Sequence, residues 1–137
     1  MTICLDASII VKFLAYESGS DKALEWLNSH DGEEFVAPAF FLAEVASVLQ
    51  RRVRKGEVTF EERDDAFDIL ESMQIRSVWD FDLIRRAIEL ADRISQPTIY
   101  DTVYLAVAER EQCSLMTADE RFVAAASSEY PLMRLLK

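Results

Sequence analysis

The chain has 137 residues, with 25 acidic and 15 basic side chains, three glycines and three prolines, and half of its residues are hydrophobic. This length predicts one domain over residues 1–137, and the composition excludes a disordered, collagen-like or low-complexity chain. The net charge of −10 argues against a protein that binds nucleic acid through a broadly positive surface, although it leaves local contacts open.

Three features bear on the compartment and on membrane insertion. Cys4 and Cys113 both lie in apolar surroundings, which predicts buried free thiols and a cytoplasmic protein. The N-terminus lacks the basic region of a secretory signal. The longest uncharged stretch in the middle of the chain, 35–43, contains Pro38 and is too short to cross a bilayer. We therefore expect no membrane segment.

The first quarter of the chain predicts strands and helices in alternation. An apolar run over 2–5 ends at Asp6 and is typical of a buried parallel strand. Apolar residues at helical spacing predict a helix over 7–16, and a second helix follows Gly19–Ser20. A further strand is predicted over 35–37, where Pro38 closes it.

The clearest helix is predicted over 39–55. Its apolar stripe comprises Phe41, Val45, Val48, Leu49 and Val53. Gly56 stands where a glycine cap would end this helix. The segment 59–62 matches a capping box that opens another helix, with Phe67 and Leu70 facing inward.

The second half of the chain continues the alternation. The predicted elements are a strand over 75–78, helices over 80–94 and 98–111, a strand over 114–116, a short helix from Asp119 and a strand over 133–136. The helix over 98–111 is apolar on much of its surface, which indicates a central position. Together these elements predict an α/β fold with a mostly parallel sheet that helices cover on both faces.

Four carboxylates follow strand ends or lie near helix starts: Asp6, Glu44, Asp101 and Asp119. In open parallel sheets ligands bind beyond the carboxyl ends of the strands, so the fold can bring these side chains together. A structural alternative stays open for each aspartate taken singly. As a cap, Asp6 would begin the helix over 7–16; the segments 98–101 and 117–120 match capping boxes, and acidic residues suit a first helical turn.

Glu44 is harder to explain as a helix cap. It lies beside the apolar stripe of its helix, where an unpaired carboxylate is costly, and the basic residues on its stripe, Arg51 and Lys55, are two and three turns away. Two carboxylates about 4 Å apart repel by roughly 4 kcal/mol at an effective dielectric of 20. Four of them in one pocket would take up protons or bind a divalent ion. Oxygen ligands without His or Cys suit Mg²⁺ or Mn²⁺, the ions of phosphoryl chemistry.

Four segments carry a family resemblance: Leu5-Asp-Ala-Ser-Ile-Ile-Val-Lys12, Ala43-Glu-Val45, Tyr100-Asp-Thr-Val-Tyr-Leu-Ala-Val-Ala-Glu109 and Leu115-Met-Thr-Ala-Asp-Glu-Arg-Phe122. Their order and positions resemble the motifs of PIN-domain ribonucleases, and more narrowly of the VapC-like toxins of toxin–antitoxin pairs. The resemblance implies a three-layer α/β/α sandwich and Mg²⁺-dependent cleavage of RNA.

The resemblance also implies roles for individual residues. Asp6 and Asp101 match the core metal ligands, while Glu44 and Asp119 complete the acidic cluster. Ser8 and Thr117 fall where the family often places supporting hydroxyls, and Lys12 falls where it places a phosphate-binding lysine. Such toxins usually pair with an antitoxin whose C-terminal segment occupies the cleft, and they commonly form homodimers.

Two further groups are candidates for RNA contact. Arg51 and Lys55 lie on nearly the same helical stripe as Glu44 and would track the RNA backbone; alternatively, they stabilise the end of their helix. Tyr100 and Tyr104 would stack on a base or pack between helices.

Two other functions remain as alternatives. One is a PIN-fold RNA-binding module without cleavage activity. The other is a receiver-type phosphoacceptor domain, which is also small, acidic and Mg²⁺-binding. That class typically has adjacent acids after the first strand and a lysine after the last one. Here Asp6 stands alone, and no lysine lies between Lys55 and Lys137.

Overall fold

A computed structural model describes residues 1–14 and 20–136. Its strands are β1 (Thr2–Leu5), β2 (Glu34–Pro38), β3 (Arg76–Val78), β4 (Ser114–Thr117) and β5 (Met133–Leu135). Its helices are α1 (Ala7–Leu14), α2 (Ser20–Ser29), α3 (Phe41–Arg54), α4 (Phe60–Ser72), α5 (Phe81–Arg93), α6 (Tyr100–Glu111) and α7 (Glu120–Ala126). The predicted order of strands and helices is confirmed.

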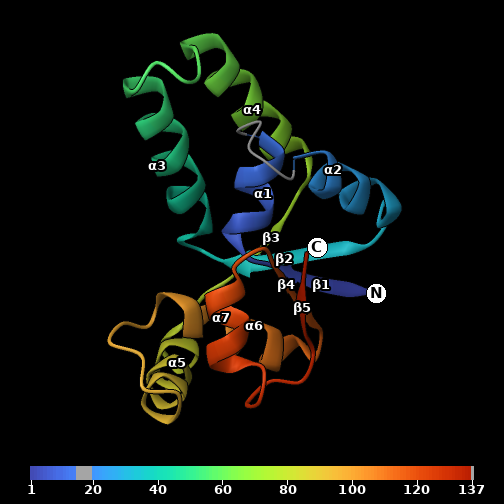
Figure 1. The fold of residues 1–137 in the computed structure, drawn as a ribbon. Coiled ribbons are helices and arrows are strands. Elements are labelled where there is room, and N and C mark those ends of the chain that lie inside the picture. The colour runs from blue at the N-terminus through green and yellow to red at the C-terminus, as the bar shows by residue number, and fades with distance from the viewer. Residues whose placement is uncertain (15–19, 137) are drawn as a thin grey trace.

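The strands form one parallel sheet in the order β3-β2-β1-β4-β5. Helices α1 to α4 lie on one face of the sheet and α5 to α7 on the other (Figure 1), so the predicted three-layer α/β/α architecture is confirmed. The chain builds outward from β1 to β3, then crosses to the opposite side for β4. This reversal lies between β1 and β4, and the carboxyl ends of strands at such a switch point are where open α/β sheets bind ligands.

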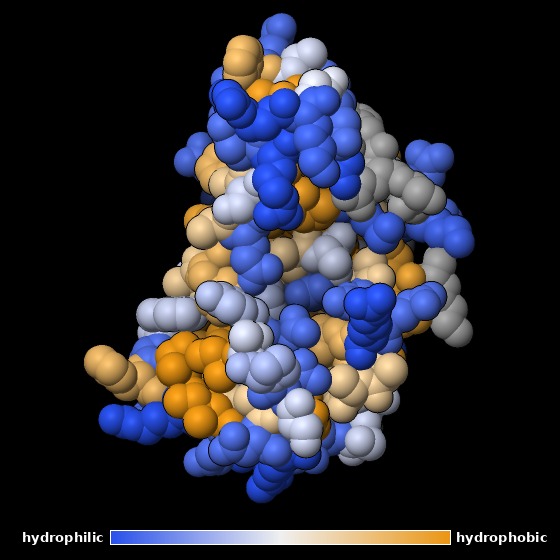
Figure 2. Space-filling model, turned by 60° about the vertical axis from the view of Figure 1, so that its left-hand side comes forward, coloured by the Kyte–Doolittle hydropathy of each residue, from blue (hydrophilic) through white to orange (hydrophobic). Residues whose placement is uncertain are grey.

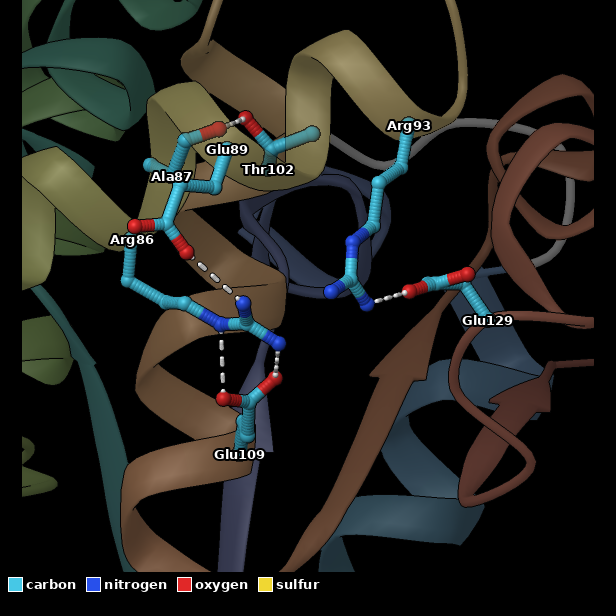
Figure 3. A network of polar contacts seen from close by, with 7 residues as sticks. All are labelled: Arg86, Ala87, Glu89, Arg93, Thr102, Glu109 and Glu129. Carbon is cyan, nitrogen blue, oxygen red and sulfur yellow. Dashed lines mark hydrogen bonds and ion pairs between the residues drawn. The ribbon is translucent and has the colours of Figure 1, made fainter.

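Helix α6 forms the centre of the core, as its composition predicts. Every residue from Thr102 to Ala108 is buried. The Thr102 hydroxyl donates a 2.8 Å hydrogen bond to the carbonyl oxygen of Ala87 in α5 (Figure 3). At the edge of the same contact, Arg86 of α5 donates to both carboxylate oxygens of Glu109 in α6. Surface ion pairs contribute at most about 1 kcal/mol, so burial of α6 is the main stabilising term.

Helix ends follow their local sequence signals in two places. Gly56 has a φ of +76°, the left-handed conformation that favours glycine, and the Glu57 amide donates to the Arg52 carbonyl across it. The Thr59 hydroxyl accepts from the Glu62 amide while the Glu62 side chain accepts from the Thr59 amide. The predicted glycine cap and this capping box are confirmed.

Other expectations need correction. The box over 98–101 is wrong, because α6 begins at Tyr100 after Ile99, whose side chain makes no capping bond. The box over 117–120 is wrong, because Asp119 itself caps α7. Phe67 is 39% exposed and does not face the core. The predicted helix over 7–16 is observed to Leu14, and residues 15 and 16 lie outside the described part of the chain.

Cys4 and Cys113 are free and buried, as predicted. Among the described residues, no helix combines the length and the hydropathy needed to cross a bilayer.

Candidate active site

One pocket at the carboxyl edge of the sheet collects side chains from five different segments. It has a volume of about 260 Å³, and its polar lining comprises Asp6, Ser8, Lys12, Glu44, Asp101 and Asp119. Figure 2 shows a hydrophilic hollow between the part of the molecule above the sheet and the part below it. All four predicted carboxylates therefore line one pocket at the switch point, although Asp6 and Asp119 are 113 residues apart in the sequence.

Asp6 is held rigidly at the floor of this pocket. It follows β1 directly and is 7% exposed. Its Oδ2 accepts hydrogen bonds from the Ser8 hydroxyl at 2.5 Å and the Thr117 hydroxyl at 2.8 Å. Burial raises the pKa of Asp6, while these hydrogen bonds and the Ser8 amide act in the opposite direction. Each hydroxyl has one proton, and both protons point at Asp6, so these two hydrogen bonds fix the orientation of its carboxylate.

The same two hydroxyls anchor the segment that carries Asp119. Ser8 Oγ accepts from the Ala118 amide at 2.9 Å, and Thr117 Oγ1 accepts from the Asp119 amide at 3.0 Å. Asp119 caps α7 through Oδ1, which accepts from the Arg121 and Phe122 amides. The capping alternative therefore holds for Asp119, but the cap uses Oδ1 and leaves Oδ2 outside it.

Glu44 enters the pocket from the first turn of α3. Burial, followed by the negative charges of Asp6 and Asp101, raises its pKa to about 7. The hydroxyl of the buried Tyr104 donates to Glu44 Oε1 at 3.4 Å and partly offsets this rise. Tyr104 belongs to α6, so this contact links the helices on opposite faces of the sheet. The predicted packing role of Tyr104 is confirmed, but nothing in the local sequence indicated its hydrogen bond to Glu44.

Asp101 projects from the first turn of α6 without taking part in the cap of that helix. Burial raises the pKa of its carboxyl group to about 6, and the charges of Asp6 and Asp119 add to the effect. Asp6, Asp101 and Asp119 each raise the pKa of at least one other carboxyl group of the pocket. A divalent cation would offset the negative charges that contribute to these shifts.

The donor set fits a hard cation that retains water. Within residues 1–14 and 20–136, no three Asp, Glu, His or Cys side chains converge closely enough to form a complete metal cage. Mg²⁺ commonly binds through one or two carboxylates and keeps several waters, whereas Ca²⁺ and Zn²⁺ rely on more protein ligands. An oxygen-only pocket with separated carboxylates therefore suits Mg²⁺ or Mn²⁺ better than zinc.

The predicted basic residues divide into two groups. Lys12, in α1, lines the pocket beside the carboxylates. Arg51 and Lys55 are exposed near the end of α3 and do not line it. At 1.5 Å of rise per residue, Arg51 lies about 10 Å beyond Glu44 along the helix and Lys55 about 16 Å.

The fold and the site define a three-layer α/β protein with a carboxylate-lined pocket at the switch point of a parallel sheet. A family model for the PIN domain matches residues 3–127, and the chain belongs to the PIN domain family.

Solved structures share this fold at low sequence identity. A toxin–antitoxin complex from Klebsiella pneumoniae superposes with a TM-score of 0.71 at 14% identity, covering 98% of both chains. The VapBC2 complex of Rickettsia felis, bound to a DNA fragment from its promoter, has a TM-score of 0.70 at 16% identity, over 98% of this chain and 97% of that one. PAE2754 from Pyrobaculum aerophilum has a TM-score of 0.67 at 22% identity, over 96% of each chain. No curated protein sequence matches significantly.

Proposed function

We propose that this chain is a Mg²⁺-dependent endoribonuclease and the toxin of a toxin–antitoxin pair. The observation that carries the proposal is the meeting of four carboxyl groups in one pocket, where burial, together with the neighbouring negative charges, raises the pKa of Glu44 to about 7 and of Asp101 to about 6. Burying negative charges close to one another is costly unless a cation offsets them. Membership of the PIN domain family and the likeness to toxin–antitoxin complexes support the assignment.

Asp6 and Asp101 would hold the ion, and Glu44 and Asp119 would orient the attacking water or hold a second ion. Mg²⁺, or Mn²⁺ in its place, lowers the pKa of a coordinated water and offsets charge on the phosphate. Ser8 and Thr117 fix the orientation of Asp6, as hydrogen bonds to a ligating carboxylate do in metal sites. Lys12 would bind a phosphate oxygen of the RNA, and Arg51 and Lys55 would contact the strand further from the site.

The test is cleavage of a structured RNA by the purified chain. We expect the wild type to cleave the RNA with Mg²⁺ and not with chelator. Asp101→Asn should not cleave it, while its circular-dichroism spectrum shows that the variant is folded. Asp92→Asn is the matched control, because Asp92 is an exposed helical aspartate outside the pocket. Full activity in Asp101→Asn would remove Asp101 from the mechanism. RNA binding without cleavage would instead favour a PIN-fold binding module.

A second surface feature, a groove, supports an antitoxin partner. A groove between α1, α2 and α4 has an apolar floor that includes Phe13, Leu24 and Ile69, and Asp21 and Asp65 stand on its rim. Helix α4 carries six acidic side chains and one basic one, a net charge of −5 within the chain's −10. An antitoxin segment that is apolar on one face and basic on the other would complement this groove.

We also expect two copies of this chain to form a homodimer. Helix α5 buries Leu83, Ala87 and Leu90 on one face. Two of its apolar side chains lie outside this buried face: Phe81 is 81% exposed and Ile88 is 48% exposed. Figure 2 shows a hydrophobic patch on the lower half of the molecule, to which α5 belongs. Exposed apolar side chains on a helix favour burial against a second chain, and we propose α5 as the dimer contact in a cytoplasmic complex.

A further inference from the structure

A cluster of aromatic rings is linked to the acidic pocket through Glu44 and Asp101. Phe40 makes edge-to-face contacts with Trp79, Tyr100 and Tyr104, with ring centroids 5.7, 5.7 and 5.5 Å apart. Tyr104 is buried, and its hydroxyl donates a hydrogen bond to Glu44. Tyr100 immediately precedes Asp101 in α6. The cluster is therefore connected to the pocket both by a side-chain contact and along the chain.

The sheet topology aligns this cluster with the carboxylates. Trp79 follows β3, Phe40 lies two residues beyond β2, and Asp6 follows β1. These strands are neighbours in the order β3-β2-β1 and all run parallel, so their carboxyl ends form one row. With about 4.8 Å between neighbouring strands, Trp79 stands roughly 10 Å from Asp6 along that row. A nucleic acid strand laid along this edge would reach both.

Two rings of the cluster are open to solvent: Tyr100 is 62% exposed and Trp79 is 49% exposed. Their inner neighbour Phe40 holds them by near-perpendicular packing, with interplanar angles of 89° and 85°. The two side chains are therefore supported by the fold and still present aromatic surface. Pre-oriented rings lose little conformational entropy when a flat ligand stacks on them.

The negative charge of the protein favours a ligand that binds by stacking over one that binds by phosphate attraction. With a net charge of −10, phosphate attraction is weak, and Lys12 is the basic residue that lines the pocket among the described residues. Stacking on aromatic rings needs no positive charge and is how proteins commonly bind the bases of single-stranded RNA. Two half-exposed rings present on the order of 200 Å² of surface, well below the roughly 800 Å² per partner of a stable protein interface.

We propose that Trp79 and Tyr100 form a stacking subsite for an unpaired RNA base close to the scissile phosphate. This inference rests on the proposed ribonuclease function and specifies how its substrate is held. The subsite selects single-stranded over paired RNA, because a paired base cannot present its face to the rings.

The test compares two probes of equal length and charge: a short single-stranded oligoadenylate and a matched abasic ribose-phosphate chain. Binding is measured by fluorescence anisotropy for the wild type, Trp79→Ala, Trp79→Phe and Tyr100→Ala. Phe60→Ala is the control, because Phe60 is an exposed aromatic residue on α4 outside the pocket. Light scattering gives the molar mass of each variant.

We expect Trp79→Ala and Tyr100→Ala to lose roughly 5- to 100-fold in oligoadenylate affinity, the range for one stacked base, with little change on the abasic chain. Trp79→Phe should retain most of the affinity and Phe60→Ala all of it. Equal losses on both probes, or no loss, would overturn the subsite. A lower molar mass with unchanged affinity would assign the rings to a contact with a second copy of the chain and would also overturn the subsite.

If the wild type cleaves RNA with Mg²⁺ while the alanine variants bind normally, only the subsite fails. If the wild type neither binds nor cleaves RNA, the proposed function fails with it.

Discussion

The Thr117 hydroxyl donates a 2.8 Å hydrogen bond to Asp6 Oδ2, joining the carboxyl ends of two neighbouring strands. The same oxygen of Thr117 accepts from the Asp119 amide. One fully buried hydroxyl thus orients one carboxylate of the pocket and positions the backbone of another. Because Thr117 does not itself line the pocket, we expect it to support the proposed catalysis through Asp6 and Asp119.

Replacing Thr117 by Val removes that hydroxyl at almost constant volume. We expect the rate of RNA cleavage and the affinity for Mn²⁺ each to fall about 10- to 100-fold, as for other residues that orient metal ligands. The free energy of unfolding should fall by about 1–3 kcal/mol, because the Asp119 amide loses its acceptor. Thr117→Ser keeps the hydroxyl and should restore most of the activity. Titration calorimetry and cleavage rates measure both effects, and a fully active Thr117→Val would contradict the orienting role.

The raised pKa values predict how stability depends on pH. Glu44 and Asp101 titrate near 7 and 6 in the folded chain, above their ordinary values of 4.5 and 3.8. The folded state therefore binds more protons than the unfolded state between about pH 4 and 7, and their contribution to stability is lost as pH rises through this window. In chelator, the melting temperature should be lower at pH 7.5 than at pH 5.

Adding Mg²⁺ should reverse this trend, because an ion bound to the carboxylates stabilises the folded state at the higher pH. The difference between chelator and Mg²⁺ is on the order of 1–3 kcal/mol at neutral pH. Glu44→Gln should flatten the pH dependence in chelator, whereas Glu89→Gln, an exposed control on α5, should not. Melting temperatures that rise with pH in chelator, with or without Glu44, would contradict the raised pKa values of these carboxyl groups.

Much of this site could be predicted because its parts have local signals. Asp6 ends an apolar run, and Glu44 interrupts an apolar stripe, so both stand out within a few residues of sequence. The bonds that connect the parts have no such signal. Ser8 meets Ala118, and Tyr104 meets Glu44, only because non-consecutive strands and helices become neighbours in the sheet order.

The errors of the sequence prediction also have a physical cause. The capping boxes over 98–101 and 117–120 match a four-residue pattern, but where a helix begins depends on tertiary packing as well as on that pattern. Phe67 lies at helical spacing from the core residues of α4, yet α4 buries only Ala66 and Leu70, so the ring remains at the surface. Periodicity predicts which side chains share a face but not how deeply that face is covered.

The position of Lys12 predicts a contribution to RNA binding that is separable from metal binding. We expect Lys12→Ala to weaken binding of a single-stranded RNA and to reduce the slope of log affinity against log salt concentration by about 0.7, the value for one phosphate contact. Its affinity for Mn²⁺ should not fall. Lys22→Ala is the matched control, because Lys22 is exposed on α2 and does not line the pocket. Unchanged RNA affinity in Lys12→Ala would leave Lys12 with a structural role.

The groove between α1, α2 and α4 predicts a preference for cationic partners. A synthetic leucine–lysine amphipathic helix should bind the chain, and its leucine–glutamate counterpart should not, because the rim is acidic and the floor apolar. Asp65→Lys should weaken binding of the cationic helix about 5- to 30-fold and make it less sensitive to salt, while Asp92→Lys on α5 should have little effect. Leu24→Ser should weaken binding of the cationic helix at every salt concentration, since this substitution removes part of the apolar floor.

RNA cleavage should persist in both groove variants, because neither side chain lines the acidic pocket. Equal binding of both helices, or loss of cleavage with Asp65→Lys, would contradict a separate docking groove.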